Sequence, residues 1–371
     1  CEQIKRLYRL TQVFISLIII EMAMSTAFNT CREHLRESII DFIWNQYGVL
    51  GVGSSSSAVL PWFIDPEPLL LFSITVARHD PRVFDEILDW LVVNERWINV
   101  RRLMTLVKQD RVVEPHLVRA VAETVADNTG KGSRWRFDQS RQKTEHEPDP
   151  LFILDGKPWS SAGVADRTFL KYGYQRSPLS LRNMSRRVPM HEPRCIAFLM
   201  RSICGVNTRA DLITLLAVRK YGHPSEIARL LGYSQRGLNE VIVEVGMSPL
   251  VGVRQDGNKK VYRWEHKNWW RLLYDTDVHP VSWIDWRALV RGLTALWRGI
   301  VEPSEQITSD YTASSLARRA MRAARRDIED SGIGAAPEDD RPHHAEEYLA
   351  VFVSDVRQLT KCLAGEGSPA T

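Results

Sequence analysis

The residue types that most often carry out catalysis are present in this chain, but their spacing matches no catalytic motif. There is no H-E-x-x-H, no G-x-S-x-G, no G-x-G-x-x-G, and no acidic trio in the basic setting that a metal-dependent nuclease needs. His343 and His344 stand beside acidic residues, which is typical of an exposed loop. We therefore predict that the chain is not an enzyme, with no catalytic residue, no metal and no cofactor. A nucleic-acid-processing enzyme without a recognisable motif stays open as an alternative.

Cysteine spacing is equally uninformative for a site. The five cysteines are scattered, odd in number and never arranged as C-x-x-C. This spacing argues against a disulfide framework and against a structural zinc site, and it favours a reducing, cytoplasmic location.

Basic charge is concentrated in the middle of the chain. The 371 residues carry a formal charge of only +4, and their hydrophobic share of 44% and charged share of 25% are ordinary for a globular protein of two or three domains. Residues 131–273, however, hold 25 basic and 13 acidic residues, or +12, whereas 1–130 carry −3 and 274–371 carry −5. Such asymmetry is expected when one surface meets a polyanion. An arginine-rich solvated surface is the alternative.

Apolar residues at helical spacing predict a mainly α protein. The helices expected from this period are a first one from residue 31 to near 47, then 69–77, 84–92, 100–107, 115–126, 286–301, 314–328 and 346–363. Asp65-Pro66 is a good helix start ahead of the second of them. Phe152–Leu154 predicts one strand, with a turn at Asp155-Gly156.

A short apolar run lies near the start of the chain. Val13–Ile20 is followed by Glu21 and is far shorter than the roughly 20 residues of a membrane-spanning helix, so we expect no membrane anchor. The basic residues before this run fit a signal peptide. We prefer another interpretation. Because the chain starts at Cys1, and Met22 or Met24 opens a more ordinary sequence, residues 1–21 would be translated upstream sequence or a fragment edge.

Two helices with clear starts are predicted from residue 207 onward. Asn207 or Thr208 caps a helix that continues to about residue 220, and Ser225 caps a short helix over 226–231. The first of these two helices carries an apolar stripe along one face.

A turn, a third helix and a hairpin follow. Gly232 provides the left-handed residue of a tight turn, and Ser234 opens a helix that stops near Gly246. Two short apolar runs, 250–254 and 261–264, then flank a segment with Asp-Gly at its centre, which is a strong local hairpin signal.

Residues 224–264 resemble the winged helix-turn-helix domains of bacterial transcriptional regulators of the broad MarR/ArsR-like type. The small Ala228 would let two helices pack closely, and Gly232 makes the turn four residues later. Leu238 and Val241 would then anchor the third helix in the core. The resemblance extends over residues 207–264 only, and it implies three helices plus a β-hairpin, flanked here by helical domains.

The resemblance implies that the third helix reads DNA bases. Its outward face would enter the major groove, where arginine pairs with guanine and where glutamine or asparagine matches adenine. The residues so presented to base edges are Ser234, Gln235, Arg236, Asn239 and Glu240.

The hairpin would in turn contact the DNA backbone. Arg254, Lys259, Lys260 and Arg263 would bind phosphates and set affinity and register without reading sequence. The implied function is a sequence-specific regulator that binds double-stranded DNA. Because such domains commonly read two half-sites, we expect a homodimer.

Negative charge on the third helix supports a different use of the same fold. Glu240 and Glu244 would lie near the DNA, and they also suit a helix that packs on another protein. A winged helix that serves as a protein-docking module therefore remains the alternative function.

Composition and these patterns together divide the chain into six segments. They are an N-terminal extension (1–30), a helical domain (31–127), a polar linker (128–150), a basic connector (151–206), the winged-helix DNA-binding domain (207–273) and a helical C-terminal domain with a possible dimerisation role (274–371).

Two arginine groups lie outside the winged-helix segment. The group at 176, 182, 186, 187 and 194 either follows the DNA backbone or forms the solvated face of a connector. The group at 318, 319, 322, 325 and 326 either reaches DNA or pairs with acidic residues of a second subunit. Tryptophans at 269, 270, 283, 286 and 297 favour packing or a dimer interface over base stacking.

Overall fold

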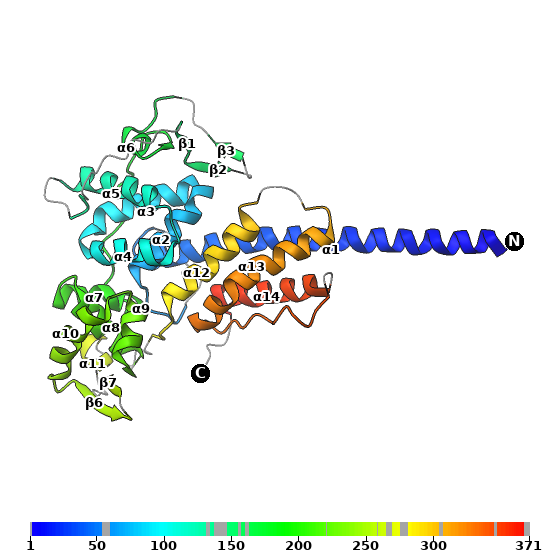
Figure 1. Ribbon diagram of the computed structural model, residues 1–371. Helices are drawn as coiled ribbons and strands as arrows, with labels where there is room; N and C mark the ends of the chain where they lie inside the picture. The colour runs from blue at the N-terminus through cyan, green and yellow to red at the C-terminus, as the bar shows by residue number, and fades with distance from the viewer. Residues whose placement is uncertain are drawn as a thin grey trace. The chain divides into compact units, whose positions relative to one another are not determined.

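A computed structural model describes most of the chain (Figure 1). The described residues are 2–53, 60–130, 134–136, 147–154, 157–159, 163–219, 221–257, 259–264, 269–274, 281–303, 307–344 and 347–366, with side chains from residue 26 onward except at 269 and 272. Over these residues the protein is mainly helical and carries a few small sheets, as the apolar periodicity predicts.

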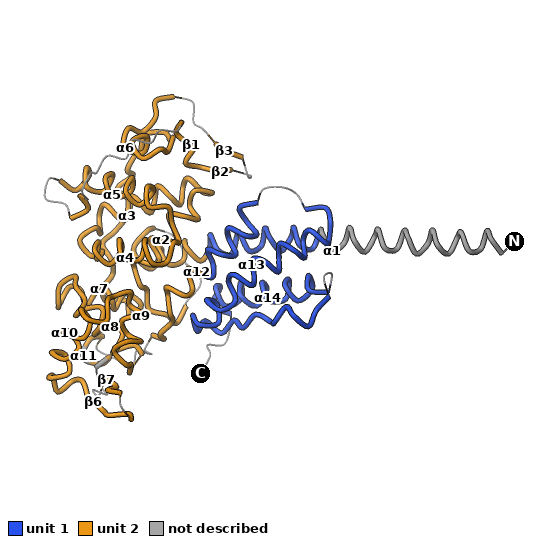
Figure 2. The backbone as a smooth tube through the Cα atoms, in the orientation of Figure 1, with its two compact units in different colours: residues 1–41, 292–371 blue, residues 42–291 orange. Residues whose placement is uncertain are grey.

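The chain forms two compact units, which Figure 2 shows in different colours. Unit 1 comprises residues 1–41 and 292–371, and unit 2 comprises residues 42–291. Helices α1 (Glu2–Val49) and α12 (Trp286–Leu296) each contribute residues to both units.

Unit 1 is a group of closely packed helices. Besides parts of α1 and α12 it holds the π-helical turn η4 (Trp297–Val301), α13 (Asp310–Ser331) and α14 (Glu347–Ala364). A Cβ atom at Gly299 would lie 2.7 Å from the Cβ of Ala320, so a small residue is needed on each side of this helix contact. Phe28 and Phe352, with ring centroids 6.0 Å apart, pack α1 on α14.

Unit 2 begins with a layer of four helices. They are α2 (Pro66–Val76), α3 (Pro81–Asn94), α4 (Val100–Asp110) and α5 (Pro115–Thr129), with the 3-10 turns η1 (Ala77–His79) after α2 and η2 (Glu95–Trp97) after α3. Three of the four helices start with proline, whose fixed φ suits the first helical position. Trp90 is buried in this layer, and its indole N–H donates to the carbonyl of Leu50 at 2.8 Å.

Small strands and short helices follow α5. Strand β1 (Asp149–Pro150) pairs in parallel with β4 (Tyr174–Gln175), and β2 (Phe152–Leu154) pairs antiparallel with β3 (Lys157–Trp159). The strand predicted at 152–154 is thus confirmed, while the turn at 155–156 lies outside the described residues. Helix α6 (Arg167–Lys171), the turn η3 (Pro193–Cys195) and α7 (Ile196–Cys204) complete this part.

Residues 208–264 contain three helices and a sheet, and are named the 208–264 segment below. Its elements in order are α8 (Thr208–Arg219), β5 (Tyr221–Gly222), α9 (Pro224–Leu231), α10 (Gln235–Gly246), β6 (Val251–Asp256) and β7 (Lys259–Trp264). The three strands form one antiparallel sheet in the order β5–β7–β6. Figure 1 shows the β6–β7 hairpin beside α10. Helix α11 (Trp269–Tyr274) follows the hairpin.

A single apolar cluster holds the 208–264 segment together. Leu215 of α8, Ile227 of α9, Leu238 and Ile242 of α10 and Tyr262 of β7 are all buried in it. Gly232 adopts φ +76°, the left-handed conformation predicted for the turn between α9 and α10. The hairpin predicted around Asp-Gly is confirmed, although its residue 258 lies outside the described residues.

The first helix, expected from residue 31, begins at Glu2 instead. Within the 208–264 segment, helix starts agree with the sequence except at α9. Asn207 accepts hydrogen bonds from Arg209 and Ala210 N–H at the start of α8, and Ser234 caps α10 by accepting from Gly237 N–H at 3.2 Å. The prediction that Ser225 caps a helix over 226–231 is wrong. Helix α9 starts two residues earlier at Pro224, and the ring nitrogen of His223 accepts from Ser225 N–H, because proline is preorganised for the first helical turn.

The boundaries between compact units differ from the six predicted segments. The predicted helical domain 31–127 is divided near residue 41, because α1 continues without a break from one unit into the other. The predicted connector 151–206 and the predicted domain 207–273 both lie in unit 2. Of the predicted linker 128–150, residues 131–133 and 137–146 lie outside the described residues, and Trp135 between them is buried.

Candidate nucleic-acid interface

The outward face of α10 carries the side chains that the sequence singled out. Ser234, Gln235, Arg236, Asn239 and Glu240 are all exposed, whereas Leu238, Ile242 and Val245 of the same helix are buried. The helical period therefore separates a core face from a polar face, and the buried leucine fixes the rotation of the helix.

Three of these five residues have partners in the structure. The Ser234 hydroxyl accepts a hydrogen bond from Gly237 N–H, so it stabilises the helix start. Glu240 lies one turn from Arg236, with 3.9 Å between its carboxylate and the guanidinium, and the two side chains are 74% and 94% exposed. Such an exposed pair is worth less than about 1 kcal/mol and yields readily to a stronger partner.

Glu244, the other acidic residue of α10, is neutralised by an arginine of a neighbouring helix. The guanidinium of Arg209, near the start of α8, forms an ion pair with its carboxylate. The sequence pattern gives no sign of this pair, because the two residues are 35 positions apart.

The hairpin distributes its four predicted cations over two faces. Cross-strand partners share a face, and successive residues alternate between faces. Lys260 pairs with Gln255 on the face that contains the buried Tyr262, which packs toward α10. Arg254, Lys259 and Arg263 are exposed on the opposite face, although the sequence places all four close together.

This outer face also holds two residues that sequence reasoning missed. Tyr221 of β5 pairs with Arg263 of β7, and its ring is 57% exposed. The guanidinium carbon of Arg219 lies 6.0 Å from the centre of this ring, while the same guanidinium is paired with Glu226. The local sequence could not predict strand β5, because a strand of two residues becomes recognisable only through its pairing with β7.

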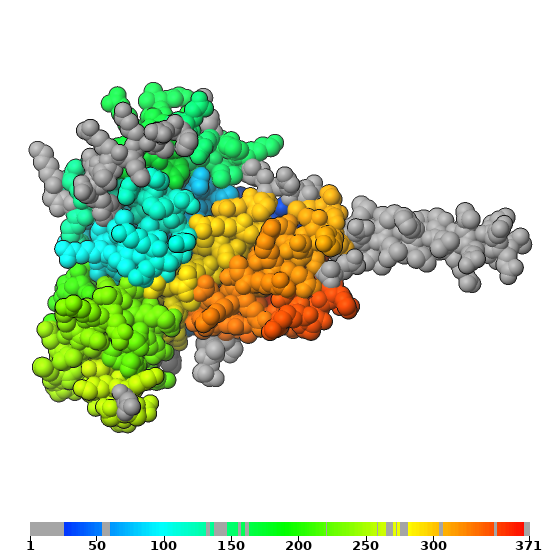
Figure 3. Space-filling model, viewed as in Figure 1, coloured from blue at the N-terminus to red at the C-terminus, as the bar shows by residue number. Residues whose placement is uncertain are grey.

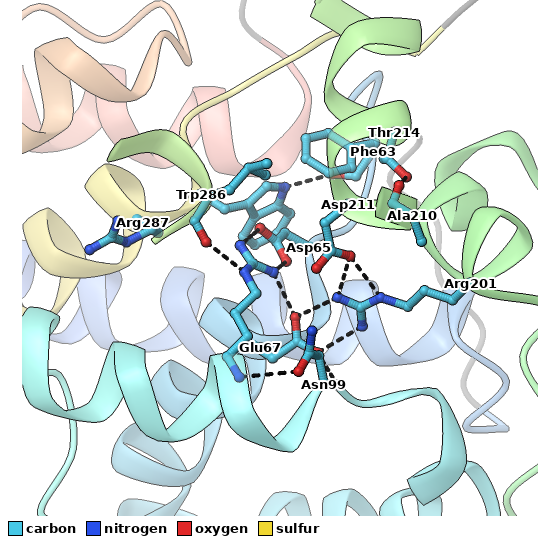
Figure 4. A network of polar contacts seen from close by, with 12 residues as sticks. Phe63, Asp65, Glu67, Asn99, Arg201, Ala210, Asp211, Thr214, Trp286 and Arg287 are labelled. Atoms are coloured by element: carbon cyan, nitrogen blue, oxygen red, sulfur yellow. Dashed lines mark hydrogen bonds and ion pairs between the residues drawn. The ribbon is translucent and has the colours of Figure 1, made fainter. Parts of the chain in front are cut away.

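A buried ion network connects α8 of the 208–264 segment to earlier helices of unit 2 (Figure 4). Arg201 of α7 donates to both oxygens of Glu67 at 2.7 and 2.8 Å, and to Asp211 of α8 at 2.8 Å. Arg102 of α4 donates to the same Glu67 at 2.6 Å and to both oxygens of Asp65 at 2.5 and 2.6 Å. All five residues are at most 6% exposed, so the network joins α2, α4, α7 and α8 in a dry environment.

Opposing charges decide the ionisation of this network. Burial disfavours the charged form of each arginine, yet Asp65 and Glu67 around Arg102, and Asp211 and Glu67 around Arg201, raise the pKa of both guanidinium groups. Burial also works against the Asp211 carboxylate, but Arg201 and Arg102 outweigh it and lower its pKa. At Asp65 burial prevails and raises the pKa.

The network reaches the turn that precedes α10. Arg102 donates through Nε to the carbonyl of Leu231, the last residue of α9, at 2.8 Å. The Tyr233 hydroxyl donates to Asp211 at 2.5 Å and accepts from the side-chain amide of Asn99 at 2.9 Å. The residues on both sides of Gly232 are therefore fixed to helices α4 and α8 by buried or partly buried hydrogen bonds.

The start of α12 fixes α9 from another side. Arg287 donates to Asp110 of α4 at 2.6 and 2.9 Å and to the carbonyl of Arg229 in α9. Arg229 in turn lies 3.3 Å from the carboxylate of Asp285. Trp286, buried as predicted, donates its indole N–H to the Phe63 carbonyl at 2.6 Å.

The predicted basic connector does not present a continuous basic surface. Arg176 is buried, pairs with Asp85 at 2.9 Å and lies 5.2–5.8 Å from the centres of three phenylalanine rings. Arg194 is also buried and donates to Gln46 at 2.8 Å. These two arginines belong to the interior of unit 2. They therefore fit neither contact with the DNA backbone nor the solvated face of a connector.

Four of the five arginines of α13 have carboxylate partners within their own unit. Arg318 and Arg322 pair with Asp340 at 3.3 and 2.6 Å, and Arg325 pairs with Glu329 at 2.8 Å. A second subunit is not needed to neutralise these four.

His343, predicted in an exposed loop, is partly buried and lies 3.6 Å from Glu338.

Comparisons with protein-family models, with curated proteins and with solved structures found no match to this chain. Over the residues that the structure describes, no group of three His, Cys, Asp or Glu side chains is placed to hold a metal ion. Within the same residues no helix has both the length and the apolar character needed to cross a membrane.

Proposed function

We propose that the protein is a sequence-specific DNA-binding transcriptional regulator whose 208–264 segment is a winged helix-turn-helix. The order of its elements carries the proposal: α8, β5, α9, α10 and then the β6–β7 hairpin, with β7 between β5 and β6. Two helices joined by a short turn with a left-handed glycine are typical of the helix-turn-helix, and an added hairpin is typical of its winged form.

The exposed face of α10 supports its use as the recognition helix. Arg236 can give two parallel hydrogen bonds to guanine, and Gln235 and Asn239 can each bind adenine in the same way. Binding of Arg236 to a base would replace its weak pair with Glu240, which is then free to accept from cytosine. Ser234 would serve mainly as the helix cap.

The hairpin supports the proposal through its phosphate-binding cations. Lys260 lies on the hairpin face that packs toward α10, so it is the cation best placed to reach the backbone of DNA bound by that helix. Arg254, Lys259 and Arg263 face the other way and would serve a neighbouring stretch of backbone. We further propose that two copies bind two half-sites, since one helix contacts only a few base pairs.

The base-reading role of α10 is tested by selecting binders from random double-stranded DNA and then comparing variants by fluorescence anisotropy. Arg236→Ala is expected to lose about 1–3 kcal/mol on the selected site and to relax the preference at one base pair. Arg326→Ala is the matched control, because Arg326 is 92% exposed on α13 and has the same spacing to its own carboxylate partner, Asp330. Equal affinities of both variants and the parent protein would contradict the proposal.

The backbone role of the hairpin is tested by the salt dependence of DNA binding. Each phosphate contact that is lost lowers the slope of log K against log[salt] by about 0.9. Lys260→Ala is expected to lower the slope by about that amount, and Arg263→Ala, on the opposite face, by less. Affinity that does not change with salt, in the parent protein, rules out DNA binding of this kind.

A protein-docking role for the same segment is the second candidate. Val243 of α10, Met247 directly after α10 and Val253 of β6 are 50%, 79% and 44% exposed, which is unusual for apolar residues on a DNA-facing surface. If the selection yields no DNA site, and if Val243→Asp abolishes the binding of a protein partner while Arg236→Ala does not, the docking role is the correct one. Turnover of nucleic acid that is lost on changing a carboxylate would instead identify an enzyme.

A further inference from the structure

A pocket of about 730 Å³ lies in unit 2, next to the start of α4. Its walls come from the first turns of α4, from Arg134 and from Val206 in the connection between α7 and α8. The volume is within the range of about 300–1,000 Å³ that is typical of small-molecule sites. The pocket is separate from the exposed face of α10 and from the hairpin.

The charged residues that line this pocket are all cations. Arg101 and Lys108 are exposed on α4 and lie two helical turns apart, so they share one face of that helix with Met104. Among the described residues neither cation has an ion-pair partner, and no acidic residue lines the pocket. Arg134 is held by donation to the carbonyl of Arg96, which leaves its charge without a carboxylate. The positive end of the α4 dipole adds to this field.

Three apolar side chains also line the pocket. Val100 and Met104 of α4 and Val206 contribute surface that a phosphodiester backbone would not use. A ligand that matches the lining therefore has an anionic group for the cations and an apolar part for these three residues. An aromatic or aliphatic carboxylate or phosphate monoester has this chemistry.

The pocket is connected by hydrogen bonds to the start of α10. Asn99 lines it, and its side-chain amide donates to the Tyr233 hydroxyl at 2.9 Å. Tyr233 directly precedes Ser234, the cap of α10. Arg102, next to the pocket residue Arg101, holds the carbonyl of Leu231 at the end of α9. Val206 directly precedes Asn207, the cap of α8.

We propose that this pocket binds a small organic anion, and that the bound anion changes the DNA affinity of α10. The anion would draw Arg101 and Lys108 together and shift the start of α4. Asn99 and Arg102 would pass this shift to the residues on both sides of Gly232. The second half of the proposal rests on the proposed function, whereas the binding itself does not.

Anion binding is measured by calorimetry on the full chain with benzoate and phenyl phosphate, and with benzamide as the uncharged probe. Both anions are expected to bind, and benzamide to bind at least about tenfold more weakly. Arg101→Gln with Lys108→Gln is expected to weaken anion binding at least about tenfold. The matched control is Arg319→Gln with Arg326→Gln, two exposed arginines of α13. Absence of anion binding at millimolar concentration, or equal binding by the pocket variant, overturns the proposal.

The same variant distinguishes an organic anion from DNA phosphate as the occupant. If these cations contact DNA, the pocket variant lowers the salt slope of DNA binding and binds neither probe differently from the parent protein. That result overturns the proposal. Inorganic phosphate, which lacks an apolar part, is expected to bind more weakly than phenyl phosphate.

The coupling is tested by DNA affinity with and without saturating anion, at constant ionic strength set by chloride. The anion is expected to shift the affinity by about 5-fold or more in the parent protein. Tyr233→Phe removes the hydroxyl that Asn99 contacts and is expected to bind the anion normally but to lose the shift. An unchanged shift in this variant overturns the coupling. If the anion binds and no DNA does, the pocket stands and the proposed function fails.

Discussion

Glu67 is the residue on which the buried network depends most directly. Its carboxylate is fully buried and accepts from Arg102, from Arg201 and from the backbone N–H of Asn99. If this acceptor changed, Arg102 would keep Asp65 and Arg201 would keep Asp211, but each guanidinium would lose a charge-assisted hydrogen bond at a buried position, where an unsatisfied polar group is costly. The network therefore stabilises unit 2 only as a complete set.

Replacing Glu67 should be much more damaging than replacing an exposed glutamate with the same kind of partner. Glu67→Gln is expected to lower the free energy of unfolding by about 1.5–3 kcal/mol, measured by urea denaturation, because the amide N–H groups would face two guanidinium groups that also donate. Glu226→Gln is the control, because Glu226 pairs with Arg219 at the surface, and its loss should be at most about 1 kcal/mol. Similar losses for both variants would show that the network contributes no more than a surface pair.

Asp355 gives unit 1 a dependence on pH. Burial raises the pKa of this α14 carboxyl to about 6, although its Oδ2 accepts from Glu338 N–H at 3.1 Å. Since the folded state favours the protonated form, the resulting stability is fully present below the unfolded pKa, about 3.9, and is lost as the pH rises through about 6.

Asp355→Asn should therefore stabilise the protein at neutral and alkaline pH. The amide keeps the shape and an acceptor but carries no charge, so we expect a gain of about 1–2 kcal/mol at pH 8 and little gain at pH 4. Thermal unfolding across this pH range measures the difference. Asp330→Asn on the exposed part of α13 is the control and should change little at either pH. A gain that is the same at all pH values would disprove the role of ionisation.

At the scale of elements, the turn between α9 and α10 depends on a contact with α4. Gly232 has φ +76°, and a Cβ there would lie 2.4 Å from Cδ2 of Leu106. Gly332, which ends α13, has nearly the same backbone conformation and has open space around the same position. Comparing the two glycines therefore distinguishes the cost of a left-handed backbone, which both share, from the cost of a steric clash, which only Gly232 would have.

Alanine at these two glycines should have different effects. Gly332→Ala is expected to cost about 1–2 kcal/mol, the cost of a left-handed L-residue. Gly232→Ala is expected to cost about 1–3 kcal/mol more, because Leu106 or the turn must move. Chemical denaturation measures both, and DNA affinity should fall in Gly232→Ala alone. Equal losses would mean that α4 yields to the added methyl group without cost.

At the scale of the whole molecule, part of the basic charge in the middle of the sequence is internal or already paired. Arg176, Arg194 and Arg201 are buried, and Arg209 and Arg219 have carboxylate partners. The net +12 of residues 131–273 is therefore a poor measure of any polyanion-binding surface. The cations that face solvent on α10, the hairpin and the α4 pocket are few and lie in distinct places.

Local patterns predicted the elements well. The helix expected at 115–126 is α5, the strand at 152–154 is β2, and Asp-Gly marks the β6–β7 turn. Capping and periodicity are short-range effects, so they are visible within about ten residues.

Long-range pairing could not be predicted in the same way. Glu67 and Arg201 are 134 positions apart, and each looks like an ordinary charged residue among its neighbours. Lys260 lies on one face of the hairpin, and Arg254 and Arg263 lie on the other. This division follows from the pairing register of the two strands, which the sequence does not give. The exposed residues of α10 were identified because a buried leucine at Leu238 defines the opposite face.

The members of the buried network are synthesised at different times, which affects when the network can form. Glu67 leaves the ribosome 134 residues before Arg201, and Asp211 follows ten residues after that arginine. At about 5–20 residues per second, this delay amounts to roughly 7–27 seconds. Until Arg201 and Asp211 emerge, Arg102 can pair with Asp65 and Glu67, but the second arginine and the third carboxylate of the network are missing. The first helices of unit 2 therefore wait, incompletely docked, for the segment that they will support.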